Sequence, residues 1–189
     1  MRVLLSALKK LIFPIEHWLS PLYCVPWEIR QEYNRALISL AEGSGETPRL
    51  LQAVMDINWT QPYPIVHLLE SRFRYLAGMR IALLGLAFKA ATDDIRESRA
   101  ILIVQALLEK GAVVVGYNPL AMDTMKKLFP EIDYAKSSSD ALQGADGCIV
   151  LTESPVFAAL YGEFNQMNTR MVIEGRRILQ PKEKHGIRW

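Results

Sequence analysis

The chain has 189 residues, half of them hydrophobic, and a formal net charge of +2 at neutral pH. This length can bury one substantial core, and the interspersed acidic and basic residues argue against a nucleic-acid partner. The two cysteines form neither a disulfide framework nor a metal-binding spacing, and no apolar run reaches membrane-spanning length, so we expect a cytoplasmic protein without a metal site.

The first twenty residues combine apolar and basic side chains. Lys9 and Lys10 interrupt the apolar stretch and no small-residue cleavage site follows, which disfavours a signal peptide. The apolar residues recur at helical spacing and predict an amphipathic helix that ends near Pro14. We expect this helix to pack on the domain or on another copy of the chain, and a membrane-surface role is the less favoured alternative.

Two further helices are predicted, over residues 28–40 and 48–77, with a glycine-rich turn between them. Pro62 and Pro64 fall within the second helix, and each removes a backbone donor, so we expect a kink or break there. Gly78 is expected to end this helix.

From Met79 onwards, strand and helix patterns alternate at short intervals. This alternation predicts a parallel sheet with right-handed crossovers and therefore an α/β, Rossmann-like fold. The expected strands are residues 79–84, 112–116, 132–134, 147–151 and 170–173. We therefore divide the chain into a helical segment, residues 1–78, and a sheet domain, residues 79–189.

A charged loop follows the first predicted strand. Ser98 lies where a helix N-cap is expected, ahead of apolar positions at helical spacing that end at Gly111. Ligands of open parallel sheets bind at the carboxyl ends of the strands, where this loop lies. Lys89 and Arg96 offer cationic donors for phosphate or carboxylate. The loop is therefore a candidate anion site, and the alternative is a solvated, mutually neutralising charge cluster.

The glycine fingerprint of a dinucleotide-binding domain is not found in this loop. Gly85 stands alone where G-x-G-x-x-G requires three glycines, and the second strand leads to Asn118 instead of an acidic residue that would hold a ribose hydroxyl. The sheet domain is therefore not predicted to bind NAD by itself. Three polar residues of the loop are expected to hold its shape by bonding nearby backbone N–H groups: Thr92, Asp93 and Asp94.

The loop belongs to the longer string GLAFKAATDDIRES, residues 85–98. Further strings follow it, namely EKGAVVVGYNP, KKLFPEIDYA, ALQGADGCIVLTESPVF and IEGRRIL, and ETPRLLQAVMDINWTQP precedes it. Together they resemble the central and nucleotide-sugar-binding regions of the UDP-glucose/GDP-mannose dehydrogenase family, whose pattern includes G-L-A-F-K-x-x-T-D-D-x-R-E-S. The resemblance covers roughly residues 35–188.

The resemblance implies a particular organisation. Enzymes of this family have two Rossmann-like domains that flank a central helix: the first binds NAD, the last binds the nucleotide sugar, and the helix builds a dimer. This chain resembles only the end of the central region and the last domain. The resemblance thus implies a UDP-sugar ligand, NAD as cofactor, a homodimer through the central helix, and an NAD domain on a separate polypeptide.

The family pattern also assigns roles to individual residues. Phe88 and Lys89 are implied substrate contacts, with Lys89 near the diphosphate or the sugar. Arg96 corresponds to the arginine that reaches toward NAD. Arg176, within Glu174-Gly175-Arg176, corresponds to a D-G-R arginine that lines the uridine pocket, although glutamate replaces the aspartate. The alternative for Arg176 is a surface cation that follows an edge strand.

Cys24 is the candidate nucleophile. The family oxidises a primary alcohol to a carboxylate in two hydride transfers, through a thiohemiacetal on the cysteine of G-G-x-C-[FIL]-P-K-D. Cys24-Val25-Pro26 matches Cys-x-Pro, but the motif's glycines are replaced, and Trp27 stands for its lysine, a source of the positive charge that lowers a thiol pKa. The alternative is a buried or incidental thiol. Cys148, within an apolar strand, is expected in the core.

Two functions remain open. The first is the carboxyl-terminal portion of an NAD-dependent dehydrogenase that converts UDP-glucose to UDP-glucuronate and is inactive without its NAD domain. The second is a non-catalytic module that binds a nucleotide sugar or dimerises. Thr152 and Glu153 end the fourth predicted strand and are expected to face the crevice, and by resemblance Glu153 favours UDP-glucose over an N-acetylmannosamine substrate.

Overall fold

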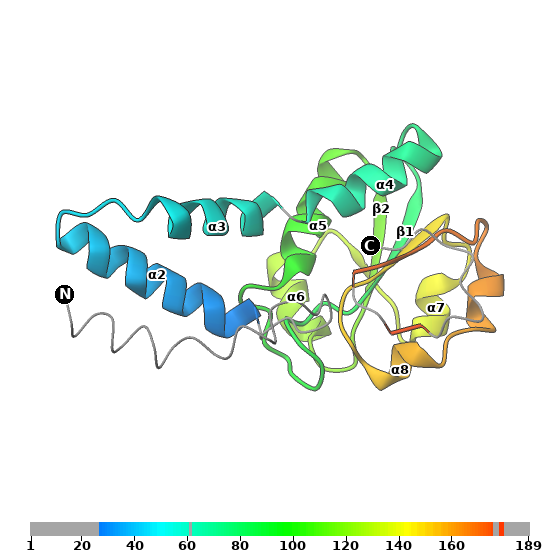
Figure 1. Ribbon diagram of the computed structural model, residues 1–189. Helices are drawn as coiled ribbons and strands as arrows, with labels where there is room; N and C mark the ends of the chain where they lie inside the picture. Colours follow the sequence, from blue (N-terminus) through cyan, green and yellow to red (C-terminus); the bar gives the residue numbers. More distant parts are fainter. Residues whose placement is uncertain (1–26, 61, 176–177, 180–189) are drawn as a thin grey trace. The chain divides into compact units, whose positions relative to one another are not determined.

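The computed structural model describes residues 27–60, 62–175 and 178–179 (Figure 1). The predicted helix near Pro14 and the candidate residues Cys24 and Arg176 lie outside the described residues. The helical elements are α2 (Trp27–Gly43), α3 (Arg49–Thr60), α4 (Tyr63–Phe73), α5 (Arg99–Glu109), α6 (Met122–Leu128), α7 (Ser138–Leu142), α8 (Pro155–Ala158) and the 3-10 helix η2 (Glu163–Gln166). The strands are β1 (Arg80–Leu84), β2 (Val113–Tyr117), β3 (Asp133–Tyr134), β4 (Gly147–Val150) and β5 (Val172–Glu174).

The chain divides into two compact units, one ending at Ile57 and the other beginning at Asn58. The first unit holds α2 and most of α3. Three large apolar side chains of α2 are exposed and recur at helical spacing: Tyr33, Leu37 and Leu40. None of the helices in the described part of the chain has the length and apolar character needed to traverse a bilayer.

The helix predicted over residues 48–77 is interrupted, as its prolines indicate. α3 ends at Thr60 and α4 begins at Tyr63, with Pro62 at the N-cap position. The prediction that Gly78 ends the helix is wrong, because α4 already ends at Phe73. Arg74 adopts a φ of 60° and its N–H donates to the carbonyl of Glu70, which closes the helix without a glycine.

The second unit contains the expected parallel sheet, with strand order β3-β2-β1-β4-β5. Helices cover both faces of this sheet (Figure 1). Side chains of β1 alternate between the two faces, as a pleated strand requires. Ile81 and Leu83 pack with a cluster that includes α4 and α5, whereas Ala82 and Leu84 pack with a cluster that includes α7 and α8. The α/β class and the helical segment that precedes the sheet are therefore confirmed.

Helix α4 belongs to the packing of the sheet. Val66 and Leu69 of α4 are fully buried in the same cluster as Ile81. The predicted domain division lies between Gly78 and Met79, but the second compact unit begins earlier, at Asn58, because α4 covers one face of the strands.

Candidate functional site

The candidate site lies at the carboxyl ends of β2, β1 and β4. β1 is the middle strand of the sheet, and the chain order reverses direction between β1 and β4. Such a switch point opens a crevice in which α/β proteins bind ligands. Gly85 follows β1, Asn118 follows β2 and Thr152 follows β4.

Asn118 holds the beginning of the loop that follows β1. Its Oδ1 accepts hydrogen bonds from the N–H groups of Leu86 and Ala87, at 3.1 and 3.5 Å, and the residue is 5% exposed. In a dinucleotide-binding fold, N–H groups at this turn face the pyrophosphate. Here Asn118 accepts from the N–H groups of Leu86 and Ala87, so these two groups are not available to an anion.

Ser98 joins the far end of the loop to its beginning. Its hydroxyl accepts a hydrogen bond from the N–H of Ala100 at 3.2 Å and donates to the carbonyl of Leu86 at 2.7 Å. The predicted N-cap of α5 is thus confirmed, and the loop is closed at its base by a buried side chain.

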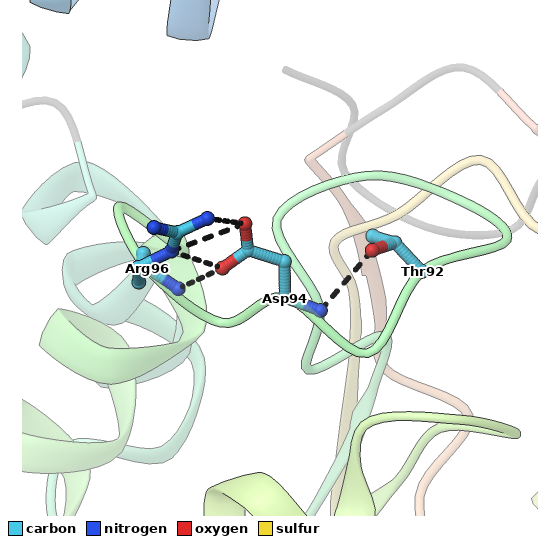
Figure 2. A network of polar contacts seen from close by, with 3 residues as sticks. All are labelled: Thr92, Asp94 and Arg96. Atoms are coloured by element: carbon cyan, nitrogen blue, oxygen red, sulfur yellow. Dashed lines mark hydrogen bonds and ion pairs between the residues drawn. The ribbon is translucent and has the colours of Figure 1, made fainter.

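The polar residues within the loop form a connected network (Figure 2). Thr92 Oγ1 accepts a hydrogen bond from the N–H of Asp94 at 3.2 Å, and Asp94 Oδ1 accepts one from the N–H of Arg96 at 2.9 Å. The expectation that Thr92 and Asp94 shape the loop is confirmed. Asp93 is exposed and makes no hydrogen bond to other described residues, so the same expectation fails for Asp93.

The Asp94 carboxylate also binds the Arg96 side chain in a forked arrangement (Figure 2). Arg96 Nε lies 3.0 and 3.2 Å from the two carboxylate oxygens, and Nη2 lies 2.8 Å from Oδ2. These hydrogen bonds lower the pKa of Asp94, and the charge of Lys89 lowers it further. Asp94 is therefore an anion at neutral pH.

Phe88 and Lys89 lie at the start of the same loop. The N–H of Phe88 donates to the carbonyl of Asp94 at 3.0 Å, which brings the two halves of the loop together, and Lys89 is exposed. Ala91 and Glu97 have φ values of 57° and 61°, a conformation uncommon for residues with side chains. Backbone strain of this kind persists where surrounding contacts impose it.

Thr152 borders the site on the β4 side. The residue is 4% exposed, and its Oγ1 has no hydrogen-bond partner among the described residues. It lies against Gly85, whose φ is +95°. Glu153, in contrast, is exposed. A buried hydroxyl without a partner is destabilising.

Glu174 ends β5 and is buried, although the sequence singled it out only as a departure from a family motif. Its Oε1 accepts hydrogen bonds from the N–H groups of Ile178 and Leu179, at 3.0 and 2.7 Å. Glu174 therefore fixes the chain on the far side of Arg176, which itself lies outside the described residues. An acidic residue at the end of an apolar strand is the sequence signal for such a role.

The structure thus brings three of the predicted site residues onto one loop at the carboxyl edge of the sheet: Phe88, Lys89 and Arg96. The structural roles of Asn118 and Glu174 were not predicted. Cys148 lies in the core, as expected, and burial raises the pKa of its thiol.

Comparison with known proteins adds independent information. A family model described as "UDP-glucose/GDP-mannose dehydrogenase family, UDP binding domain" matches residues 82–181. The UDP-glucose 6-dehydrogenase AglM of Haloferax volcanii is 54% identical over 148 residues, which cover 78% of this chain and 34% of that protein. The UDP-glucose 6-dehydrogenase of Rhizobium meliloti is 34% identical over 161 residues, or 82% of this chain and 36% of that protein.

Among solved structures, the UDP-glucose dehydrogenase of Pyrobaculum islandicum matches with a TM-score of 0.72 and 32% identity. The match covers 82% of this chain and 35% of that one. The chain thus spans about a third of the length of the curated relatives it matches.

Proposed function

The chain belongs to the UDP-glucose/GDP-mannose dehydrogenase family, and on that premise we propose that it is the carboxyl-terminal, UDP-glucose-binding portion of an NAD-dependent UDP-glucose 6-dehydrogenase. The observation that carries the proposal is the loop of residues 85–98, which presents Lys89 and Arg96 at the switch point of the sheet. This loop lies within the region that matches the UDP-binding domain.

Side chains would hold the ligand in this site. Lys89 is exposed on a loop fixed at its base by Asn118 and Ser98, so its ammonium group can meet the diphosphate without reordering the backbone. Phe88 is half-buried beside it and would contact the sugar nucleotide. Arg176 would line the uridine pocket, in a segment whose far end Glu174 holds.

NAD does not fit the sheet domain by itself. The N–H groups that would receive its pyrophosphate already donate to Asn118, and Gly85 stands alone at this turn. We therefore derive no hydride-transfer step within this chain. In the proposal, a separate NAD-binding domain supplies the cofactor, Arg96 contacts it, and Cys24 acts as the nucleophile that retains the sugar between the two oxidations.

A second copy of the chain is the proposed partner of the helical segment. Tyr33, Leu37 and Leu40 form an exposed apolar face on α2, and a face of this kind favours helix-to-helix association. The dimer is part of the proposal, because the family's central helix has this role.

Calorimetric titration with UDP-glucose tests the substrate assignment. We expect the full chain to bind UDP-glucose, and Lys89→Ala to weaken binding by about 1.5–3 kcal/mol, because a charge-assisted contact to the diphosphate is lost. Lys127→Ala is the matched control, since Lys127 is an exposed lysine in the last turn of α6, which leads toward the amino end of β3. Equal affinities of the wild-type chain and Lys89→Ala would contradict the assignment.

A turnover assay separates catalysis from binding. The alternative function, a non-catalytic nucleotide-sugar-binding or dimerisation module, is favoured by the occupied N–H groups of Leu86 and Ala87. When UDP-glucose and NAD are added to the chain alone, we expect no sustained formation of NADH at 340 nm. Sustained turnover that disappears in Cys24→Ala would show that the chain is active without a separate domain.

A further inference from the structure

Asp94 pairs with one of the two cations of the loop. Its carboxylate forms the forked pair with Arg96, and the same oxygen that accepts from Arg96 Nε also accepts from the Arg96 backbone N–H (Figure 2). The charge of Lys89 also favours the ionised carboxylate and lowers the pKa of Asp94. One carboxylate thus holds both the backbone and the side chain of Arg96.

The forked pair restrains the orientation of an exposed side chain. The Arg96 side chain is 87% exposed, and an exposed arginine samples many rotamers. Two parallel N–H···O bonds set both the position and the plane of the guanidinium. The carboxylate is itself anchored, because the N–H of Asp94 donates to Thr92 and its carbonyl accepts from Phe88.

We propose that Asp94 is a positioning residue, which holds the Arg96 guanidinium in the orientation that receives a phosphate group of a ligand at this loop. The inference rests on the proposed function in one respect, since that function gives the loop an anionic ligand. Asp94 does not touch this ligand but acts through Arg96.

Two physical effects predict opposite results when the Asp94 charge is removed. By Coulomb's law alone, the loss of a negative charge near two cations strengthens the binding of an anion. If Asp94 positions Arg96, its loss weakens binding, because the ligand must then immobilise the arginine. Ordering one such side chain corresponds to roughly a 2- to 10-fold loss of affinity.

Titration of the full chain with inorganic pyrophosphate distinguishes these effects. We expect Asp94→Asn to weaken pyrophosphate binding about 2- to 10-fold, and the matched variant Asp93→Asn to leave it unchanged or slightly stronger. Asp93 carries the same charge on the same loop without a bond to Arg96. The double variant Asp94→Asn/Arg96→Ala should bind no more weakly than Arg96→Ala, because Asp94 acts through the arginine.

The pair can also be observed directly. The Nε–H proton of Arg96, assigned by its loss in Arg96→Lys, should give a dispersed and slowly exchanging NMR signal that moves to the solvent-averaged position in Asp94→Asn. Circular dichroism should show that both asparagine variants keep the fold.

Three results would overturn the inference: tighter pyrophosphate binding in Asp94→Asn, additive losses in the double variant, or a wild-type chain that does not bind pyrophosphate. The UDP-glucose titration decides the proposed function separately. If UDP-glucose binds while the coupling between Asp94 and Arg96 is missing, only the inference fails. If the coupling is found but UDP-glucose does not bind, only the substrate assignment fails.

Discussion

Replacing Gly85 with alanine is expected to lower the free energy of unfolding by about 2–5 kcal/mol, the sum of a positive-φ penalty and an overpacking penalty. A Cβ at this position would lie 2.2 Å from Thr152 Oγ1 and 2.7 Å from the Thr152 backbone nitrogen, and the φ of Gly85 is +95°. The side-chain clash could be relieved by rotation, but the contact with the backbone nitrogen could not. Urea denaturation followed by circular dichroism measures the loss.

Gly144→Ala is the control for this substitution. Gly144 also has a positive φ, of +67°, but a Cβ there would meet no atom within 4 Å. Gly144→Ala should therefore lower the free energy of unfolding only by the positive-φ penalty, about 1–2 kcal/mol. Similar losses in both variants would mean that β1 and β4 do not approach each other as closely at Gly85 as the structure indicates.

Leu69→Ala is expected to destabilise the sheet unit by about 2–5 kcal/mol, because it opens a cavity between α4 and the sheet. Leu69 is fully buried, and a Cβ on Gly147 of β4 would lie 3.0 Å from its Cδ2 atom. Helix and strand are thus packed without space to spare. Thermal unfolding monitored by circular dichroism reports the change.

Leu120→Ala deletes the same atoms from a leucine that is exposed in the loop after β2. This substitution should change the free energy of unfolding by no more than about 0.5 kcal/mol. If Leu69→Ala behaved like Leu120→Ala, α4 would not be part of the folded unit that contains the strands.

Much of the fold could be predicted because its signals are local. Ile81 to Leu84 and Gly147 to Val150 are continuous apolar runs, and strands buried on both faces of a parallel sheet require such runs. Ser98 predicts the start of α5, because serine is a preferred N-cap residue and its side chain accepts a hydrogen bond from the helix. The end of α4 was mispredicted because Arg74 takes up a positive φ, for which the sequence carries no local signal.

The site was predictable only in part. Lys89 and Arg96 could be placed because they follow a recognisable strand. The role of Asn118 could not be predicted, because its side-chain oxygen accepts hydrogen bonds from residues 31 and 32 positions away. Such pairings depend on the register of β1 against β2. The role of Glu174 could not be predicted either. Its carboxylate accepts from backbone N–H groups, which nearly every residue type provides, so the sequence does not identify its partners.

The central position of β1 has a consequence for how the chain acquires its structure. β1 pairs with β2 and β4, and at its amino end the N–H of Arg80 bonds Asp146, 66 positions later. During synthesis, β1 therefore emerges long before its second neighbour, β4. Until β4 forms, one edge of β1 has no hydrogen-bonding partner. Closing such distant pairings is slow and leaves an unpaired strand edge open to other chains. The pairing of β4 with β1 then covers this open edge of the strand.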